Sequence, residues 1–278
     1  MTDSDLRTDL KIDRERSPMK LFDSHCHLQA FAFKHRISDV MAKAAGANVV
    51  RMVCCGTAPD DWQEVKELAR AYESVIPSFG VHPFYMDGAG RGWQDMLRAY
   101  LAEEPAGIGE IGIDFLRSDL DRERQEEIFT EQLVMAKEMH LPASIHVRKG
   151  WDTLIHILKR IGPLEPGGVI HSYSGSADLV DVLERYGLYI SFSGSVTRPN
   201  AKKVKKALAQ VSTDRVLIET DSPDILPTMP DRDKDEANEP CNLPVVAKAA
   251  AAVRNTEAEE FALLAFENGE RLYKGVTG

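Results

Sequence analysis

Two histidines one residue apart, His25 and His27, lie in the stretch LFDSHCHL at residues 21–28. Alternate side chains of a β-strand point to the same face, so a strand here would direct both imidazoles to one side. Two imidazoles placed in this way can bind one divalent metal ion, but a metal site needs three or four ligands. The alternative is a strand end that merely carries two histidines. The case for a metal therefore depends on ligands supplied by the rest of the chain.

Further residues of ligand type lie at or near the C-terminal ends of later predicted strands; they are Glu110, His146, His171 and Asp221. Four imidazoles and two carboxylates exceed the needs of one tetrahedral ion and suit two divalent ions with a carboxylate between them. We predict that Glu110 bridges the two ions. The ligands of the first ion would be His25, His27 and Asp221, and those of the second would be His146 and His171.

This arrangement of ligands predicts hydrolysis by activated water. A divalent ion lowers the pKa of bound water, and a second ion can polarise a phosphoryl or carbonyl oxygen. Asp221 could hold the water and take its proton, acting both as ligand and as general base. The sequence contains no GxSxG motif, no P-loop and no convincing cysteine nucleophile. Direct attack by water is therefore favoured over a covalent intermediate.

A second group of residues could assist this chemistry. His82, which precedes a proline at the end of a predicted strand, could hydrogen-bond the substrate or be structural. Arg148 shares the strand face of His146 and would point toward the mouth of the fold as a phosphate clamp. Asp114 and Glu219 also share the face of predicted ligands. For both, pairing with buried cations and a role in catalysis are equally consistent with the pattern.

Three other features have both a structural and a functional interpretation. The first is a basic cluster, which is expected to be a solvated helix face and has a DNA-tracking surface as its alternative interpretation; it contains Lys202, Lys203, Lys205 and Lys206. Phe84 and Tyr85 follow a predicted strand and could either pack in the core or stack on a base. The remaining histidines are expected to lie outside the site; they are His35, His140 and His156.

Eight short apolar runs alternate with amphipathic helical segments. The predicted strands lie at 21–28, 49–55, 75–81, 106–113, 142–147, 168–172, 188–193 and 216–220. Helices are predicted at 38–45, from 59, at 93–101, from 118, and at 151–161, 176–186, 200–210, 242–254 and 256–272, with Ser38 capping the first. This alternation indicates a parallel sheet covered by helices. We predict an α/β fold of the (β/α)8 TIM-type barrel class, because only a closed ring brings such dispersed strand ends together.

Composition fits a single barrel domain at residues 19–278. The chain has 278 residues, of which 43% are hydrophobic and 28% are charged, enough for one large core. Residues 1–18 mix both charge signs with few apolar residues and predict a flexible N-terminal extension. The long loop from Pro223 to Pro240 is expected to fold over the barrel mouth.

Charge and hydropathy limit the partners. The formal net charge of −10 gives no global positive field that would attract nucleic acid or anionic membrane. The sequence has neither an apolar run long enough to span a bilayer nor a signal-like segment, so no membrane partner is expected. Four cysteines without CxxC spacing predict reduced thiols and a cytoplasmic location.

A set of motifs spread from about residue 20 to residue 274 carries a family resemblance. The motifs are DSHCHL, GVHP, GEIGID, RQEEIFTEQL, LPASIHVR, VIHSYSGS, YISFSG, IETDSP and NEP. Together they resemble the TatD family of metal-dependent deoxyribonucleases, which belongs to the amidohydrolase superfamily of barrel enzymes. The resemblance implies a binuclear site on the six predicted ligands and a 3′-5′ exonuclease acting on single-stranded or frayed 3′ ends of DNA. It implies no obligate protein partner.

Three positions depart from the family pattern. Phe84 stands where relatives often have histidine, Ala237 where they often have arginine, and Asp224 where they usually have a tyrosine-like residue. These departures leave the ligands intact but alter the rim where substrate would bind. An ester or amide hydrolase, such as a D-aminoacyl-tRNA deacylase, is therefore the alternative function, and a binding protein with a vestigial site is a third. Magnesium, manganese and zinc are the candidate ions. Imidazole-rich ligation suits manganese or zinc, whereas magnesium prefers oxygen and is a candidate because the family resemblance implies it.

Overall fold

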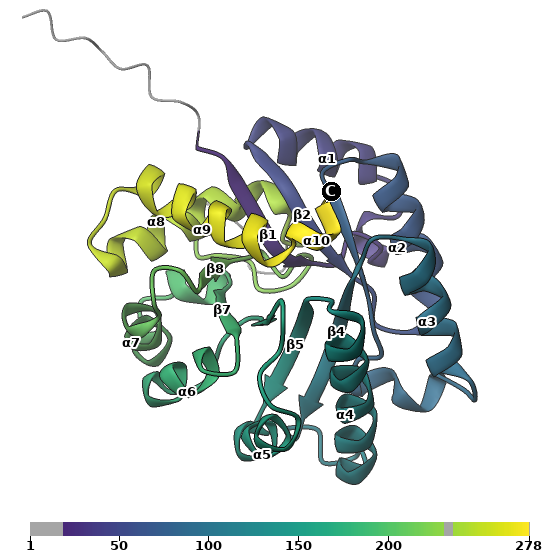
Figure 1. Ribbon diagram of the computed structural model, residues 1–278. Coiled ribbons are helices and arrows are strands. Elements are labelled where there is room, and N and C mark those ends of the chain that lie inside the picture. The colour runs from purple at the N-terminus through teal and green to yellow at the C-terminus, as the bar shows by residue number, and fades with distance from the viewer. Residues whose placement is uncertain (1–18, 231–235, 278) are drawn as a thin grey trace, which may run out of the picture.

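The eight strands form one parallel sheet whose order in space is their order in the chain. The computed structural model describes residues 19–230 and 236–277, so the predicted N-terminal extension lies outside the described residues. The strands are β1 (Leu21–Cys26), β2 (Val49–Cys55), β3 (Val75–Phe79), β4 (Gly107–Asp114), β5 (Ala143–Arg148), β6 (Gly168–Ile170), β7 (Leu188–Phe192) and β8 (Val216–Ile218). The predicted (β/α)8 barrel in a single domain is confirmed (Figure 1).

Backbone hydrogen bonds join the two ends of this sheet. The segment after β8 lies beside β1: Asp221 N donates to the carbonyl oxygen of His25 at 3.0 Å, and His27 N donates to that of Ser222 at 2.8 Å. The seam of the barrel therefore runs between residues that the sequence marks as metal ligands.

Helices surround the sheet (Figure 1). They are α1 (Ile37–Gly46), α2 (Pro59–Ala71), α3 (Trp93–Glu103), α4 (Arg122–Met139), α5 (Trp151–Ile161), α6 (Val180–Glu184), α7 (Lys202–Gln210), α8 (Leu243–Arg254), α9 (Ala258–Leu272) and α10 (Lys274–Thr277). Short 3₁₀ turns are η1 (Phe31–Phe33), η2 (Pro83–Gly88), η3 (Ala177–Leu179), η4 (Gly194–Thr197) and η5 (Pro240–Asn242). Within the described residues, no helix is both long enough and apolar enough to cross a bilayer.

The core has two parts. The larger one packs between the sheet and the helices, where α5 buries Leu154, Ile157 and Leu158 and leaves its polar side outward. The smaller one fills the barrel interior with side chains from several strands and is closed by the C-terminal helices; its members include Phe22, Val53, Ile76, Val169, Leu217, Leu272 and Tyr273. One end of the barrel is thus filled with apolar side chains, which leaves the C-terminal ends of the strands for polar ones.

Some element boundaries differ from the predictions. The prediction that Ser38 caps the first helix was wrong: α1 begins at Ile37, and Arg36 occupies the N-cap position without a side-chain cap. The helix expected from residue 118 begins at Arg122, because the Asp121 carboxylate accepts hydrogen bonds from the first-turn amides. The single helix expected at 176–186 is a 3₁₀ turn followed by the short α6.

The loop after β8 is fixed at both of its described ends. The Asn238 side-chain amide donates to the carbonyl oxygens of Thr220 at 2.8 Å and Asp224 at 3.0 Å, which ties the end of the loop to its beginning. Pro223 and Asp224, at the start of the loop, line a cavity at the barrel mouth. Residues 231–235, the middle of the predicted covering loop, lie outside the described residues.

Candidate metal centre

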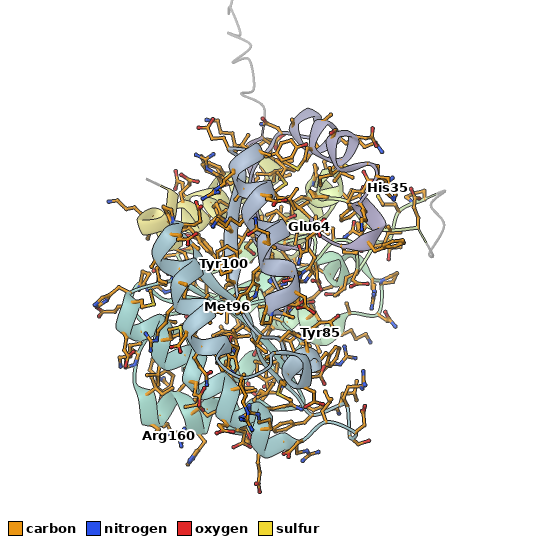
Figure 2. The ribbon with its side chains drawn as sticks, turned by 90° about the vertical axis from the view of Figure 1, so that its right-hand side faces the viewer. His35, Glu64, Tyr85, Met96, Tyr100 and Arg160 are labelled. Carbon is orange, nitrogen blue, oxygen red and sulfur yellow. The ribbon has the colours of Figure 1, made fainter. Side chains whose placement is uncertain are left out.

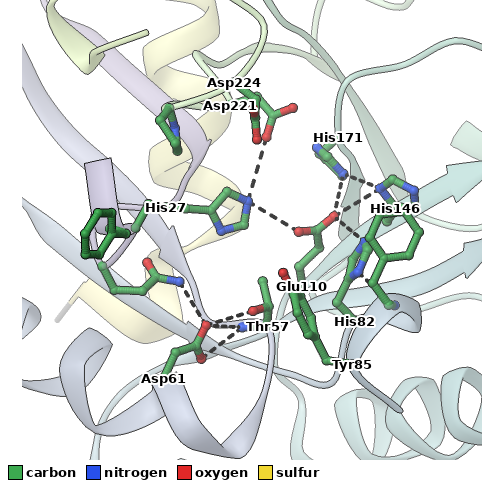
Figure 3. A pocket seen from close by; sticks show the side chains of 15 residues that line it. His27, Thr57, Asp61, His82, Tyr85, Glu110, His146, His171, Asp221 and Asp224 are labelled. Carbon is green, nitrogen blue, oxygen red and sulfur yellow. Dashed lines mark hydrogen bonds and ion pairs between the residues drawn. The ribbon is translucent and has the colours of Figure 1, made fainter. Parts of the chain in front are cut away.

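The structure brings all six predicted ligands together at the C-terminal end of the barrel. Five of them line a cavity of about 460 Å³, here called the first cavity; they are His27, Glu110, His146, His171 and Asp221. His25, the sixth, is fully buried beside them. They come from three strands, β1, β4 and β5, and from the residues just after β1, β6 and β8, so only the closed sheet brings them together (Figure 3).

The Glu110 carboxylate lies at the centre of the cluster and faces a different pair of ligands with each oxygen. Its Oε2 is 3.5 Å from His25 Nε2 and 3.4 Å from His27 Nε2. Its Oε1 is 2.9 Å from His171 Nε2 and 3.1 Å from His146 Nδ1. This division of the histidines is the geometry that a bridging carboxylate between two ions requires.

Asp221 completes the His25 side of the cluster. Its Oδ1 lies 3.7 Å from His25 Nε2 and 3.8 Å from His27 Nε2. Its backbone has a φ of +56°, a left-handed conformation that is uncommon for a residue other than glycine. The amide bonded to the His25 carbonyl holds this conformation and aims the carboxylate at the histidines.

Three triads of ligand atoms lie within 4.8 Å of one another in the described chain. Two are made only of predicted ligands: His25, His27 and Glu110 in one, and His25, His171 and Asp221 in the other. The third consists of His82, Glu110 and His146. His82, predicted as a substrate-binding group, also lies 3.4 Å from Glu110 Oε1, so it is close enough to serve the same centre.

Each ligand histidine is held from behind by a second polar group, as is usual at metal sites. The Nδ1–H of His27 donates to the carbonyl oxygen of Cys55 at 2.8 Å, which fixes the ring orientation and directs Nε2 toward Glu110. His25 Nδ1 lies 2.8 Å from Ser144 Oγ. The donor set of imidazoles and carboxylates, with ring nitrogens directed inward, therefore fits divalent ions.

Asp114 and Glu219, which the sequence left undecided, belong to this outer layer. Asp114 Oδ2 is 3.1 Å from His146 Nε2, on the side of the ring opposite Glu110. Glu219 Oε1 is 3.5 Å from His171 Nδ1. Both carboxylates are buried behind a histidine, so they orient it and raise its basicity.

Burial and proximity shift the pKa values of these groups in opposite directions. Burial would raise the pKa of Glu110, but the surrounding histidines outweigh it and hold the pKa well below the ordinary value. Burial raises the pKa of Asp221 and lowers the pKa of His25 to about 4. At His27, burial is outweighed by the Glu110 carboxylate, which raises the pKa to about 9. Without a metal, the centre therefore keeps a proton on His27 at neutral pH.

Metal binding is expected to release protons near pH 7. His27 has a raised pKa and must lose its proton to become a ligand, so metal affinity should rise as the pH increases toward about 9. Calorimetric titration with zinc in two buffers of different ionisation enthalpy measures the protons released. A His27→Asn variant should release fewer protons than the native protein. Identical heats in both buffers would contradict this expectation.

The Asp114→Asn substitution is expected to weaken metal binding or activity by roughly 10- to 100-fold, the range found for partners behind metal ligands. The change removes the negative charge behind His146 and keeps the shape of the side chain. Metal affinity and kcat/KM should be measured together. The exposed Asp119, which pairs with Arg117 outside the centre, gives the matched control Asp119→Asn, for which no change is expected.

Other predicted residues have more varied positions. Arg148 is exposed at the end of β5 and lines a second cavity beside the centre. Phe84 and Tyr85 are 40% and 50% exposed on the rim, which argues against core packing. Of the basic cluster on α7, only Lys203 lines that second cavity. His35 is exposed and lies well apart from Tyr85 (Figure 2).

Comparisons with known proteins now bear on this geometry. A family model described as TatD related DNase matches residues 22–274. The chain belongs to this family. The predicted family resemblance is thus confirmed.

Several TatD-related proteins are similar over nearly their whole length. The metal-dependent hydrolase YabD of Bacillus subtilis is 34% identical, with 91% of this chain and 99% of YabD covered. The 3′-5′ ssDNA/RNA exonuclease TatD of Cronobacter sakazakii is 31% identical, with 91% and 97% covered. The crystal structure of YjjV, a TatD homologue from Escherichia coli K12, superposes with a TM-score of 0.87 at 28% identity, covering 93% of this chain and 99% of YjjV. The chain is therefore a metal-dependent hydrolase of the TatD-related family.

Proposed function

We propose that this enzyme is a deoxyribonuclease that uses two divalent ions to remove nucleotides from single-stranded or frayed 3′ ends of DNA. The observation that carries the proposal is the Glu110 carboxylate, placed between two pairs of histidines below an open cavity. Two ions held 3.5–4 Å apart by such a carboxylate are typical of phosphoesterases and nucleases. Membership of the TatD-related family and the name of the Cronobacter relative support the same reaction.

The residues of this chain have distinct tasks in the proposed reaction. When bound, the ions would supply water of lowered pKa and positive charge next to the phosphoryl oxygens. Asp221, whose pKa burial raises, takes the proton from the attacking water. Arg148 pairs with a non-bridging phosphate oxygen, and His82 hydrogen-bonds the substrate. Water adds to phosphorus, the bond to the leaving oxygen breaks, and that oxygen takes the proton that Asp221 had accepted.

The ions and the location form part of the proposal. His25, His27 and Asp221 would hold one ion, His146 and His171 the other, and Glu110 would bridge them. Magnesium, manganese and zinc are the candidates, since the donors include both imidazole nitrogen and carboxylate oxygen. Three cysteines are buried free thiols, which is consistent with a reducing cytoplasm; they are Cys26, Cys54 and Cys55.

The deacylase alternative is not favoured. Water attack at a carbonyl could use the same ligands, but the comparisons name nucleases and metal-dependent hydrolases. A vestigial binding protein would retain substrate affinity without turnover.

One assay separates the three functions. Purified enzyme is freed of metal with a chelator and then incubated with 5′-labelled single-stranded DNA, with and without magnesium, manganese or zinc. We expect metal-dependent shortening from the 3′ end, no shortening after chelation, and no release of amino acid from a D-aminoacyl-tRNA. Deacylation without DNA cleavage would replace the proposal by the alternative. Binding of DNA without turnover under every metal would support the vestigial site.

A further inference from the structure

Two cavities meet at the metal centre and differ in charge. The first cavity, described above, shares His146, His171 and Asp221 with a second cavity of about 660 Å³. A substrate whose reacting bond lies over the centre would therefore extend into both. The second cavity is here called the cationic groove, after its four basic lining residues: Arg148, Lys149, Arg198 and Lys203.

The cations of the groove come from two segments of the barrel mouth, one that follows β5 and one that follows β7. Arg148 ends β5 and Lys149 follows it, whereas Arg198 follows η4 and Lys203 lies in the first turn of α7. All four side chains are exposed. Among the residues that the structure describes, none of the four pairs with a carboxylate, and Asp221 is the only acid that lines the groove. In a chain with a net charge of −10, this is a local site for a polyanion.

The groove continues away from the centre. A neighbouring cavity of about 600 Å³ shares Arg198 and Ile225 with it and is lined further on by Asn200 and Thr228. A path of this extent suits an extended chain with repeated negative charges better than a single small ester.

The first cavity has the opposite character. No lysine or arginine of the described chain lines it, and its acids outside the proposed ligands are Asp61 and Asp224. Exposed aromatic rings flank its opening, with Phe31 85% exposed and Tyr85 50% exposed. Such rings suit the face of a base, whereas the two acids would repel a phosphate.

Hydrogen bonds hold the polar wall of the first cavity in place. Asp61 accepts from the backbone amide of Thr57 at 2.9 Å and from its hydroxyl at 2.8 Å (Figure 3). The Gln29 side-chain amide donates to the same carboxylate at 3.1 Å. This wall offers a fixed set of acceptors to the hydroxyl and amino groups of an uncharged nucleoside.

We infer from this difference in charge that the two cavities fix the direction of the bound strand. The phosphates on the 5′ side of the scissile bond lie in the cationic groove, and the terminal 3′ nucleoside lies in the first cavity. A strand with a free 3′ hydroxyl carries no phosphate beyond the scissile one, so its terminal nucleoside alone fits a cavity with acidic walls. The inference rests on the proposed nuclease function and adds its binding subsites and polarity.

Charge reversal in the groove tests the first half of the inference. The double variant R198E/K203E is compared with K159E/R160E, which makes the same charge change at the end of α5, where Arg160 lies far from Tyr85 of the rim (Figure 2). The substrates are an oligothymidylate of roughly 20 nucleotides, longer than a typical single-strand site, and bis(4-nitrophenyl) phosphate, a diester too short to follow the groove.

For R198E/K203E we expect KM for the oligonucleotide to rise at least about tenfold. The slope of log KM against log salt concentration should fall by roughly 0.7 for each phosphate contact that is lost. Hydrolysis of bis(4-nitrophenyl) phosphate should stay within about twofold, because short-range contacts at the centre are unchanged. K159E/R160E should behave as the native enzyme with both substrates. Equal KM values of the two double variants for the oligonucleotide would show that the cationic groove does not bind the strand.

A terminal phosphate tests the polarity. A 3′-phosphorylated oligothymidylate should be cleaved more slowly than one with a 3′ hydroxyl, because the added charge would face Asp61 and Asp224. A 5′ phosphate should make no difference, and Asp224→Lys should reduce the discrimination against the 3′ phosphate. Slower cleavage of the 5′-phosphorylated strand alone would reverse the assigned direction.

The failure of this inference is distinguishable from failure of the proposed function. If the native enzyme cleaves the oligonucleotide and R198E/K203E cleaves it equally well, the groove is not a binding site for the strand, but the proposed nuclease function stands. If the native enzyme hydrolyses bis(4-nitrophenyl) phosphate but no oligonucleotide, both the proposed nuclease function and the assignment of the groove are rejected.

Discussion

Hydrolysis is expected to fall at least about 1000-fold when Glu110 is replaced by alanine, since the interactions lost with the two proposed ions amount to several kcal/mol. Among the described residues, Glu110 is the one carboxylate whose two oxygens face both pairs of histidines. Its loss would remove the proposed bridge and leave buried histidines without the charge that offsets their burial. We therefore expect metal content and kcat to fall together.

Elemental analysis of the purified variant and turnover of bis(4-nitrophenyl) phosphate measure these two losses. Glu64→Ala is the matched control, because Glu64 is exposed on α2 (Figure 2). Glu110→Gln keeps the size of the side chain and serves as a second variant in case Glu110→Ala does not fold. Circular dichroism monitors the folding of both variants. Native activity in a well-folded Glu110→Ala variant would show that Glu110 does not bridge two ions that catalysis needs.

The Gly112→Ala substitution is expected to lower the free energy of unfolding by about 3 kcal/mol, from overpacking and backbone strain together. Gly112 pairs with His146 across β4 and β5 and has a φ of +152°. A Cβ atom there would lie 2.0 Å from the His146 carbonyl oxygen, which is a backbone atom that cannot rotate away. The alanine side chain would therefore push β5 away from β4 at His146, which is a proposed metal ligand.

Activity should therefore fall together with stability in this variant, even though Gly112 has no side chain and touches no ion. Chemical denaturation and kcat/KM measure the two effects. Gly46→Ala provides the control, since nothing lies within 4 Å of a Cβ at that position. A variant with native stability would show that the two strands can separate there at little cost.

The sequence was sufficient to predict the barrel and the end of it at which the proposed ligands lie. Alternation in β1 places His25 and His27 together, and their rings lie with Nε2 atoms 3.2 Å apart. The apolar runs predicted all eight strands, because strands buried on both faces have few polar residues. The ends of β6 and β8 lie earlier than predicted, so His171 and Asp221 follow their strands.

Distances between segments far apart in the chain could not be predicted in the same way. Alternation places Asp114 on the same face as Glu110, and only the fold shows that it lies behind His146 instead of among the inner ligands. Likewise, the lysine run on α7 does not reveal that Lys203 lines the cationic groove, because the rotation of a helix about its axis is set by packing. Arg198 has no sequence motif that would mark it.

The seam between β1 and the segment after β8 has a consequence for biosynthesis. Since residues on both sides of this seam belong to the proposed centre, a nascent chain that has not yet released residue 221 from the ribosome lacks part of its ligand set. A product that ends before residue 221 is therefore expected to lack hydrolase activity, because its proposed ligand set is incomplete. We expect activity to appear only after the segment that follows β8 has been made and has packed beside β1.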